Sequence, residues 1–342
     1  MSARSAPDVL IVGGGSFGTA LTTLLADLGR RVIMWVRREE QAEEINIRHR
    51  NSRYFPEFEL PLAVRATTDL EKFIKGTPII FVVIPSRFFR EVATHIGNHI
   101  EGDQILVHAT KGIEIETFKR MSQILREETC SLKIGVFSGP NLAREIMAGN
   151  PAGATVASRY REVVDTVQSL FRGSTRMRVY GGSDVVGAEL GGAFKNIVAL
   201  AAGVADGLGF GDNTKSLLMT RGLSEMTRFG VALGADVFTF GGLAGIGDMI
   251  TTCASRLSRN HQVGEALAKG ERLDDILTRV ARVAEGVPTT LAVHRQALIL
   301  GLDLPIVRAV HSMLYEGLRP QEAVAELMKL PVGDELATLR YR

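Results

Sequence analysis

Cysteine is scarce in this chain, whose 342 residues include only Cys130 and Cys253. Neither has a second cysteine or a histidine at the spacing of metal ligands. The sequence therefore predicts no disulfide framework and no zinc site, and we expect no metal centre. This use of cysteine fits a reducing compartment, so we expect a cytoplasmic location.

A large excess of charge and long apolar runs are also missing. With 40 basic and 38 acidic residues the net charge is +2, and no basic tract or low-complexity tail indicates a nucleic-acid partner. Few apolar residues precede the first glycines, so we expect no secretory signal, and the apolar run 197–205 is too short to span a bilayer. We therefore expect no membrane insertion and small molecules as partners.

What remains is an ordinary globular composition, 45% hydrophobic and 23% charged, over a length comfortable for two domains. The first half alternates short apolar runs with helical patterns, which predicts a Rossmann-like α/β fold with a doubly wound, mostly parallel sheet. The expected strands are 8–12, 31–36, 62–66, 78–84, 104–109, 133–137, 154–158 and the strand-like 176–180.

A glycine loop follows the first strand and opens a helix. Gly13, Gly15 and Gly18 have the G-x-G-x-x-G spacing that is typical of dinucleotide binding when it lies between a strand and a helix. The first glycine allows a tight turn, the second lets a pyrophosphate approach the backbone, and the third lets the helix pack closely on the strand. A purely structural turn is the less favoured explanation.

Arg37 and Arg38 stand at the end of the second strand, where an NAD enzyme has an acidic residue for the adenosine ribose. Two guanidinium groups suit a 2′-phosphate, which makes NADP plausible, although an arginine stacked on adenine leaves NAD acceptable. Two arginines on a solvated turn are the alternative without a function.

Ligands of such sheets bind beyond the carboxyl ends of the strands. Lys111 follows the strand 104–109 and is a candidate for contact with a substrate or its phosphate, although a lone loop lysine is more often solvated. Gly139 and Asn141 follow the strand 133–137 in the same way.

The second half of the chain has a different character. Alanine and leucine dominate and no convincing strand appears, so we expect an all-helical domain. The expected domains are 1–183, which binds a dinucleotide, and 184–342, which binds the substrate and carries the catalytic group.

Lys195 is the only charged side chain between Glu189 and Asp206, in a segment rich in alanine, leucine and valine and without proline. The segment predicts a helix that is apolar nearly all round and therefore buried. Neighbours on the lysine's face are almost all small, so we expect the amine in a hollow, where burial would suit it to proton transfer. The alternative is a lysine that extends its amine to water.

A second polar group follows the turn-rich stretch 241–248. We expect Asp248 to be the N-cap of a helix that carries Arg259 on the same face three turns later. Ser258 and Asn260 would lie beside this arginine at the far end of that helix, where its fork suits a phosphate. As isolated polar residues they would more often be surface groups.

These stretches together resemble the bacterial type of NAD(P)-dependent glycerol-3-phosphate dehydrogenase. The resemblance covers nearly the whole chain through GGGSFGTALT, VIPS, HATKGIE, SGPNLAREI, ELGGAFKNIVALAAG, GLAGIGDMITTCASRLSRNHQVG and VAEGVPTT. Members of this family reversibly reduce dihydroxyacetone phosphate to sn-glycerol 3-phosphate for phospholipid synthesis, and they commonly form dimers. The resemblance implies an oxidoreductase that uses NAD or NADP and forms a homodimer.

The resemblance also implies roles for single residues, first of all Lys195 as the group that exchanges a proton with the substrate oxygen. The implied substrate contacts are Lys111, Gly139, Asn141, Lys195, Asp248, Ser258, Arg259 and Asn260. The expected cofactor contacts are the loop glycines Gly13, Gly15 and Gly18. To these the resemblance adds Ser16, Phe17, Arg37, Arg38, Lys111, Ala143, Arg259, Val283 and Glu285. Phe17 stands where the family usually has tryptophan, and Asn141 where it usually has serine or threonine.

Two other functions stay open from the residues alone. A dehydrogenase of the 3-hydroxy-acid or 6-phosphogluconate type has a similar two-domain plan, but its helix asparagine lies four residues after the lysine, where this chain has Ala199; here Asn196 is adjacent. A non-catalytic redox sensor that binds a dinucleotide would leave the polar residues of the helical half without a purpose. A sugar-nucleotide dehydrogenase would need a catalytic cysteine, and neither cysteine lies in a fitting context.

Overall fold

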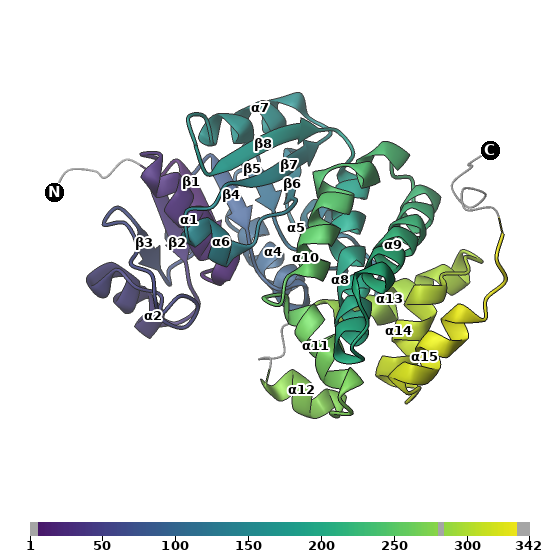
Figure 1. The fold of residues 1–342 in the computed structure, drawn as a ribbon. Helices are drawn as coiled ribbons and strands as arrows, with labels where there is room; N and C mark the ends of the chain where they lie inside the picture. Colours follow the sequence, from purple (N-terminus) through teal and green to yellow (C-terminus); the bar gives the residue numbers. More distant parts are fainter. Residues whose placement is uncertain (1–5, 280–283, 334–342) are drawn as a thin grey trace. The chain divides into compact units, whose positions relative to one another are not determined.

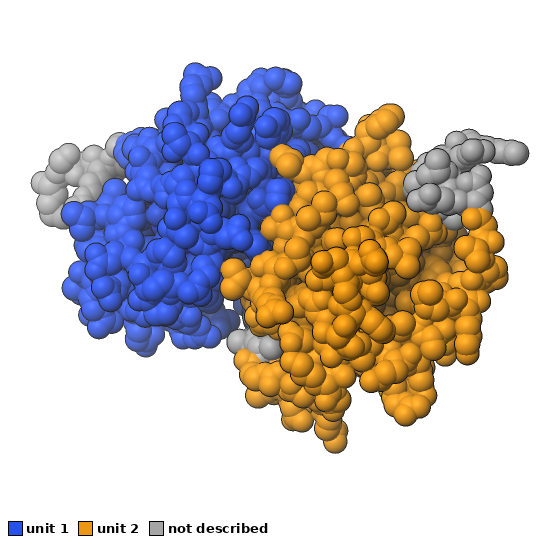
Figure 2. Space-filling model, in the orientation of Figure 1, with its two compact units in different colours: residues 1–110, 121–185 blue, residues 111–120, 186–342 orange. Residues whose placement is uncertain are grey.

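The computed structural model describes residues 6–279 and 284–333, which divide into two compact units (Figure 1). Unit 1 lies within residues 1–110 and 121–185, and unit 2 within residues 111–120 and 186–342, as the colours of Figure 2 show. The short segment 111–120 therefore belongs to the helical unit. The helical unit thus consists of two separate stretches of the sequence.

Unit 1 is built on an eight-stranded sheet in the order β3-β2-β1-β4-β5-β6-β7-β8. Neighbouring strands are parallel, except that β7 runs antiparallel to β6. The strands are β1 (Val9–Val12), β2 (Val32–Trp35), β3 (Arg65–Thr67), β4 (Ile79–Val82), β5 (Ile105–His108), β6 (Ile134–Ser138), β7 (Ala152–Ser158) and β8 (Met177–Gly182). All the expected strands are present, so the prediction of a doubly wound, mostly parallel sheet is confirmed.

Helices cover both faces of this sheet. Apolar side chains of α1, α6 and α7 pack on one face, and those of α3, α4 and α5 pack on the other. The helices are α1 (Ser16–Asp27), α2 (Glu39–Glu43), the π-helix η1 (Glu44–Arg48), α3 (Glu71–Ile74), the 3-10 helix η2 (Ser86–Phe88), α4 (Phe89–Gly97), α5 (Met121–Glu128), α6 (Ala143–Met147) and α7 (Arg161–Leu170). Because both faces are covered, the central strands β1 and β4 read as continuous apolar runs that are fully buried.

The chain reverses its direction of winding at β1. From β1 it proceeds outward to β2 and β3, and it then returns to β4 on the other side of β1. The loop that follows β1 therefore lies at the point where the strand order switches, which is where open α/β sheets bind their ligands.

Unit 2 is helical, and none of its described residues from 186 onward belongs to a strand, which confirms the prediction for this half. Its helices are α8 (Val185–Gly207), α9 (Asp212–Ala232), the 3-10 helix η3 (Val237–Gly241), the π-helix η4 (Leu243–Gly247), α10 (Asp248–Ala254), α11 (Arg259–Ala268), α12 (Leu273–Arg279), α13 (Gly286–Ile299), α14 (Pro305–Tyr315) and α15 (Pro320–Met328).

Helix α8 forms the centre of unit 2, and 18 of its 23 residues are buried. It packs against α11 at two glycines. A Cβ atom on Gly203 would lie 2.0 Å from the carbonyl oxygen of His261, and one on Gly264 would lie 2.0 Å from that of Leu200. The two backbones thus approach more closely than any larger residue would allow.

Among the described residues, α8 is the helix that is long and apolar enough to cross a membrane. The helix extends well beyond the run 197–205 on which the expectation of no membrane span was based. Of its apolar window, however, 83% is buried inside the structure, and a core helix passes the same test of length and composition.

A buried acid joins two helices of unit 2. Glu225 of α9 accepts the backbone N–H groups of Ile306 (2.7 Å) and Val307 (3.2 Å) in the first turn of α14, where helix donors have no partner in their own helix. Burial raises the pKa of Glu225 to about 7, although the two hydrogen bonds act against this rise.

We expect Glu225 to make the stability of the protein depend on pH. Its ordinary pKa is 4.5 and its folded pKa is about 7, so the folded state binds this proton more tightly than the unfolded state. The stability from the protonated group is present below the unfolded pKa and is lost as pH rises through the folded pKa. Relative to Glu225→Gln, the wild type should lose on the order of 3 kcal/mol of unfolding free energy at most between about pH 5 and 8.

Urea denaturation followed by circular dichroism at several pH values measures this difference. Glu326→Gln, an exposed change on α15, is the matched control and should follow the wild type at every pH. Parallel pH curves for the wild type and Glu225→Gln would contradict the prediction.

Candidate active site

The glycine loop has the three properties that its spacing predicts. Gly13 has φ of +127°, and a Cβ atom there would lie 2.2 Å from the carbonyl oxygen of Val83. A Cβ atom on Gly18 would lie 1.8 Å from the carbonyl oxygen of Gly13, so α1 packs directly on the turn. Gly15 precedes α1, and a Cβ atom there would meet nothing within 4 Å, which leaves room for an anion at the helix N-terminus.

Two side chains that sequence reasoning missed hold this loop in place. Gln41 donates to the carbonyl oxygen of Gly14 at 2.7 Å, and Asn51 donates to the same oxygen at 3.2 Å and to the hydroxyl of Thr19 at 2.8 Å. Asn51 is fully buried. Gln41 also donates to the side-chain oxygen of Asn51 at 3.1 Å, and no motif marks either residue in the sequence.

The other cofactor candidates near the loop are distributed over two elements. Ser16 and Phe17 form the first turn of α1, where a bound anion would lie. Arg37 and Arg38 follow β2 and are exposed. The Arg37 guanidinium lies over the Phe88 ring, 5.6 Å from its centroid, so an aromatic face accompanies the positive charge.

The end of β6 carries a second group of candidates. Gly139 has φ of +140° and a Cβ atom there would lie 2.9 Å from Cα of Ala154; Asn141 is buried, and Ala143 begins α6. Because β1, β2, β4, β5 and β6 are parallel, their carboxyl ends share one edge of the sheet. These residues therefore lie along the same edge as the glycine loop.

The principal polar cluster of unit 2 joins two amines through one carboxylate. Lys195 of α8 is 5% exposed, and its Nζ lies 2.6 Å from Asp248 Oδ1 and donates to the hydroxyl of Thr252 at 2.5 Å. Lys111 Nζ lies 2.7 Å from Asp248 Oδ2. The lysine of α8 is therefore buried and held, and the alternative in which its amine extends to water is wrong.

The electrostatic character of the cluster follows from these contacts. Burial lowers the pKa of Lys111 to about 8, and the positive charge of Lys195 also lowers it, while Asp248 attracts the proton. When both amines are protonated, two positive charges face one negative charge in a largely dry site. The cluster can therefore attract an anion and can donate a proton.

A chain of amide hydrogen bonds extends from this cluster. Asn196 donates to the carbonyl oxygen of Lys111 at 3.2 Å, and Asn260 donates to the side-chain oxygen of Asn196 at 2.9 Å. The backbone N–H of Gly286 donates to the side-chain oxygen of Asn260 at 2.9 Å. These hydrogen bonds link the segment 111–120 to α8, α11 and α13, so Asn196 belongs to the framework of the site, a role that the sequence analysis does not predict.

The expected single helix from Asp248 to Arg259 was wrong. Helix α10 ends at Ala254, where Ser255 is extended and its hydroxyl accepts the N–H of Leu257 at 3.2 Å. Ser258 is then the N-cap of α11 and accepts the N–H of His261. Serine hydroxyls offer the backbone an alternative to helical hydrogen bonds, which explains the break.

The structure also changes the expected role of Asp248. It is the first residue of α10 rather than its N-cap, and a π-helix precedes it instead of a loop of turns. Its carboxylate is consequently available to the two lysines.

The remaining candidates of unit 2 lie at the starts of helices. Arg259 is exposed in the first turn of α11, between the buried Ser258 and Asn260. Glu285 is the N-cap residue of α13. Val283 lies outside the described residues.

Cys253 lies in the same region as the two amines, but burial raises its pKa to about 12. A thiol with such a pKa stays protonated and is a poor nucleophile. This agrees with the argument against a sugar-nucleotide dehydrogenase, whose reaction needs a reactive cysteine.

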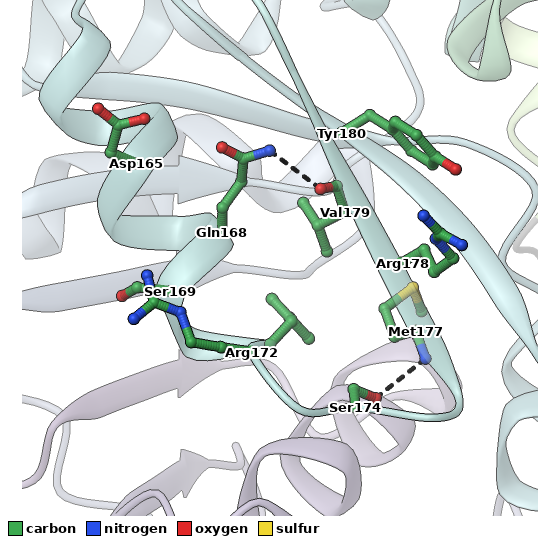
Figure 3. A pocket seen from close by; sticks show the side chains of 10 residues that line it. Asp165, Gln168, Ser169, Arg172, Ser174, Met177, Arg178, Val179 and Tyr180 are labelled. Carbon is green, nitrogen blue, oxygen red and sulfur yellow. Dashed lines mark hydrogen bonds between the residues drawn. The ribbon is translucent and has the colours of Figure 1, made fainter.

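A surface hollow of about 420 Å³ in unit 1 is lined by none of these residues. It lies between α7 and β8, and Figure 3 shows Gln168 donating to the carbonyl oxygen of Val179 and the backbone of Met177 donating to Ser174. No expected site residue lines it, so its size does not make it the candidate active site.

Two family models match nearly the whole chain. The model for the N-terminus of NAD-dependent glycerol-3-phosphate dehydrogenase matches residues 8–164, and the model for its C-terminus matches residues 184–325. The glycerol-3-phosphate dehydrogenase (NAD(P)+) of an Exiguobacterium species is 44% identical over 332 residues, covering 96% of this chain and 97% of that protein. The protein of the same name from Halothermothrix orenii is 45% identical over 322 residues, or 94% of each chain.

Solved structures agree with these matches. Glycerol-3-phosphate dehydrogenase from Coxiella burnetii superposes with a TM-score of 0.90 at 34% identity, covering 96% of this chain and 100% of that chain. A ketopantoate reductase from Ralstonia eutropha, at 13% identity and a TM-score of 0.58, shares the fold alone. With both family models and these relatives matched over almost its full length, this chain belongs to the NAD-dependent glycerol-3-phosphate dehydrogenase family.

Proposed function

We propose that this protein reduces dihydroxyacetone phosphate to sn-glycerol 3-phosphate with NADH or NADPH, in a reversible reaction. The observation that carries the proposal is the buried Lys195 amine held by Asp248 and Thr252 in a chain of this family. The relatives' shared name supports both the substrate and the use of NAD or NADP.

Unit 1 supplies the cofactor site in this proposal. The open backbone at Gly15 and the N-terminus of α1 fit the pyrophosphate of a dinucleotide, and Arg37 and Arg38 fit a 2′-phosphate. Ser16, Phe17 and Ala143 of unit 1, with Glu285 of unit 2, are further proposed contacts. Bound NADH or NADPH supplies the hydride for the carbonyl carbon.

Unit 2 supplies the proton. The Lys195 ammonium donates its proton to the carbonyl oxygen as that oxygen becomes an alkoxide, and in the reverse direction the neutral amine accepts it. Asp248 and Thr252 fix the position of Nζ, so the proton donor is oriented before the substrate binds. The positive charge of Lys111 favours the developing negative charge on the oxygen.

The phosphate of the substrate needs a separate holder. We assign this role to Arg259, whose planar fork binds phosphate oxygens in pairs, with Ser258 and Asn260 beside it. Gly139 and Asn141 are proposed as further substrate contacts. Binding energy from the phosphate can then align the distant carbonyl group for reaction.

A cytoplasmic location and a homodimer are part of the same proposal. The two free cysteines support the cytoplasmic location. The dimers that members of this family commonly form support the homodimer. The assignment of cofactor binding to the first half and substrate binding to the second half is likewise proposed.

Lys195→Ala should lower kcat for dihydroxyacetone phosphate reduction by about 10²–10⁴-fold, because the alkoxide loses its proton donor. Nicotinamide absorbance measures the rate. The wild type should consume NADH or NADPH with dihydroxyacetone phosphate and not with a 3-keto acid.

Lys269→Ala, which removes an exposed lysine of a surface ion pair, is the matched control and should leave kcat unchanged. Near-normal turnover by a folded Lys195→Ala protein would refute the role of the amine. Consumption with the keto acid alone would favour a hydroxy-acid dehydrogenase, and consumption with neither would favour a redox sensor.

The activity should also depend on pH through Lys111. Its pKa of about 8 means that the amine is charged below this pH and neutral above it, so the site loses one positive charge on going to alkaline pH. We expect kcat/KM for the anionic substrate to fall above about pH 8, because this ratio reports ionisations of the free enzyme.

Lys111→Arg separates this group from others, since a guanidinium keeps its charge throughout this range. Its pH profile should lack the decline near pH 8, whatever its overall activity. An unchanged decline in Lys111→Arg would assign the ionisation to another group.

Replacing Arg37 and Arg38 together by alanine tests the choice of cofactor. Loss of charge-assisted bonds to a 2′-phosphate should lower kcat/KM for NADPH by roughly 10- to 100-fold. The value for NADH should change much less, and Arg48→Ala, an exposed arginine on η1, should affect neither. Equal losses with both cofactors would contradict 2′-phosphate binding.

A further inference from the structure

Glu71, His95 and His99 form a compact cluster on unit 1. Glu71 begins α3, His95 lies in the last turn of α4, and His99 follows it by one turn. One ligand atom from each residue lies within 4.8 Å of the other two. Two imidazoles and a carboxylate around a single point are a set of ligands that divalent transition metals favour.

The hydrogen bond made by His99 determines which of its nitrogens faces the cluster. His99 Nδ1 lies 3.0 Å from the backbone carbonyl oxygen of His95, and a carbonyl can only accept, so Nδ1 carries the proton. The lone pair of the neutral ring is then on Nε2, which is the nitrogen nearer to Glu71. Histidines that bind metals usually donate their other N–H to a carbonyl or carboxylate in this way.

The separations within the cluster suit an ion better than a direct contact. Nε2 of His99 lies 3.5 Å and Nε2 of His95 lies 3.9 Å from the Glu71 carboxylate oxygens. Both exceed the length of a charge-assisted hydrogen bond, about 2.7–2.9 Å. Two ligands on a tetrahedral zinc ion at ~2.1 Å lie roughly 3.4 Å apart, close to the shorter separation.

The helices beneath the cluster pack on the core of unit 1. Ile74 of α3 and Ala93 and Ile96 of α4 are 0% exposed in the core on that face of the sheet. The hydroxyl of Thr94 donates to Glu128 of α5 at 2.7 Å, which links α4 to α5. His95, in the last turn of α4, and His99, in the turn that follows the helix, are therefore held close together by the packed helix and by the contact of His99 Nδ1 with the His95 carbonyl oxygen.

The cluster is also remote from the glycine loop within unit 1. Helix α4 runs from the carboxyl end of β4 back to the amino end of β5, and the histidines lie at its last turn and just beyond. The cluster thus belongs to the edge of the sheet opposite to the one where the loop after β1 lies.

Contrary to the expectation of no metal centre, we propose that Glu71, His95 and His99 bind a divalent transition-metal ion, with Zn²⁺ as the favoured ion. The side chains are 59%, 42% and 25% exposed, so an ion can reach them from solvent and water can complete its coordination. The ion joins α3 to α4, takes no part in hydride or proton transfer, and stabilises this edge of unit 1.

Zinc binding to the full-length, chelator-treated protein tests the proposal by calorimetry. We expect one Zn²⁺ per chain with micromolar or tighter affinity, and a loss of affinity of roughly tenfold or more in each of Glu71→Gln, His95→Gln and His99→Gln. Co²⁺ should give visible absorption bands in the wild type that these variants lose. Thermal unfolding without metal confirms that each variant is folded.

Two control variants should bind zinc as the wild type does. His294→Gln removes a partly exposed histidine of unit 2, and Cys130→Ser removes the exposed thiol, which is the competing soft ligand. Absence of binding to the wild type, undiminished binding to a variant that carries Glu71→Gln, His95→Gln and His99→Gln together, or loss of binding with Cys130→Ser would each overturn the proposal.

Discussion

The arrangement of unit 2 depends on the buried carboxylate of Asp248, which contacts the amines of Lys195 and Lys111 at 2.6 and 2.7 Å. Without it two ammonium groups would face each other in a largely dry site. Removing one partner of a buried ion pair typically lowers the free energy of unfolding by about 3–5 kcal/mol. This single acid therefore allows two lysine side chains to be buried next to each other. The π-helix η4 ends directly before Asp248, which is the first residue of α10.

Small residues let the helices around that acid come together. The close approach of α8 and α11 at Gly203 and Gly264 brings the side chains of Asn196 and Asn260 within hydrogen-bonding distance. Further hydrogen bonds connect Asn196 to the carbonyl oxygen of Lys111 and Asn260 to the backbone of Gly286 at the start of α13. The glycines are therefore as important as the polar residues for the geometry of this unit. A bulkier residue at Gly203 or Gly264 would push the helices apart and separate the Asn260 amide from the Asn196 oxygen.

Features encoded by local patterns could be predicted from the sequence. Apolar runs gave the strands, the glycine spacing gave the loop after β1, and the apolar context of Lys195 gave its burial. Features that depend on distant partners could not be predicted. Thr252 and Asn196 gain their roles only when α8 meets α10 and the segment 111–120, and Glu71 lies far along the chain from His95 and His99.

The placement of residues 111–120 bears on how the protein could be dissected. This segment leaves the sheet after β5, contributes Lys111 to the helical unit and returns to the sheet's helix α5. A fragment that begins at residue 186 would therefore lack part of the helical unit. One carboxylate oxygen of Asp248 would lose the Lys111 ammonium, and the amide of Asn196 would lose the carbonyl oxygen of Lys111. The helical unit is compact, yet ten of its residues come from within the first half of the chain, so a complete helical unit needs a discontinuous piece of sequence.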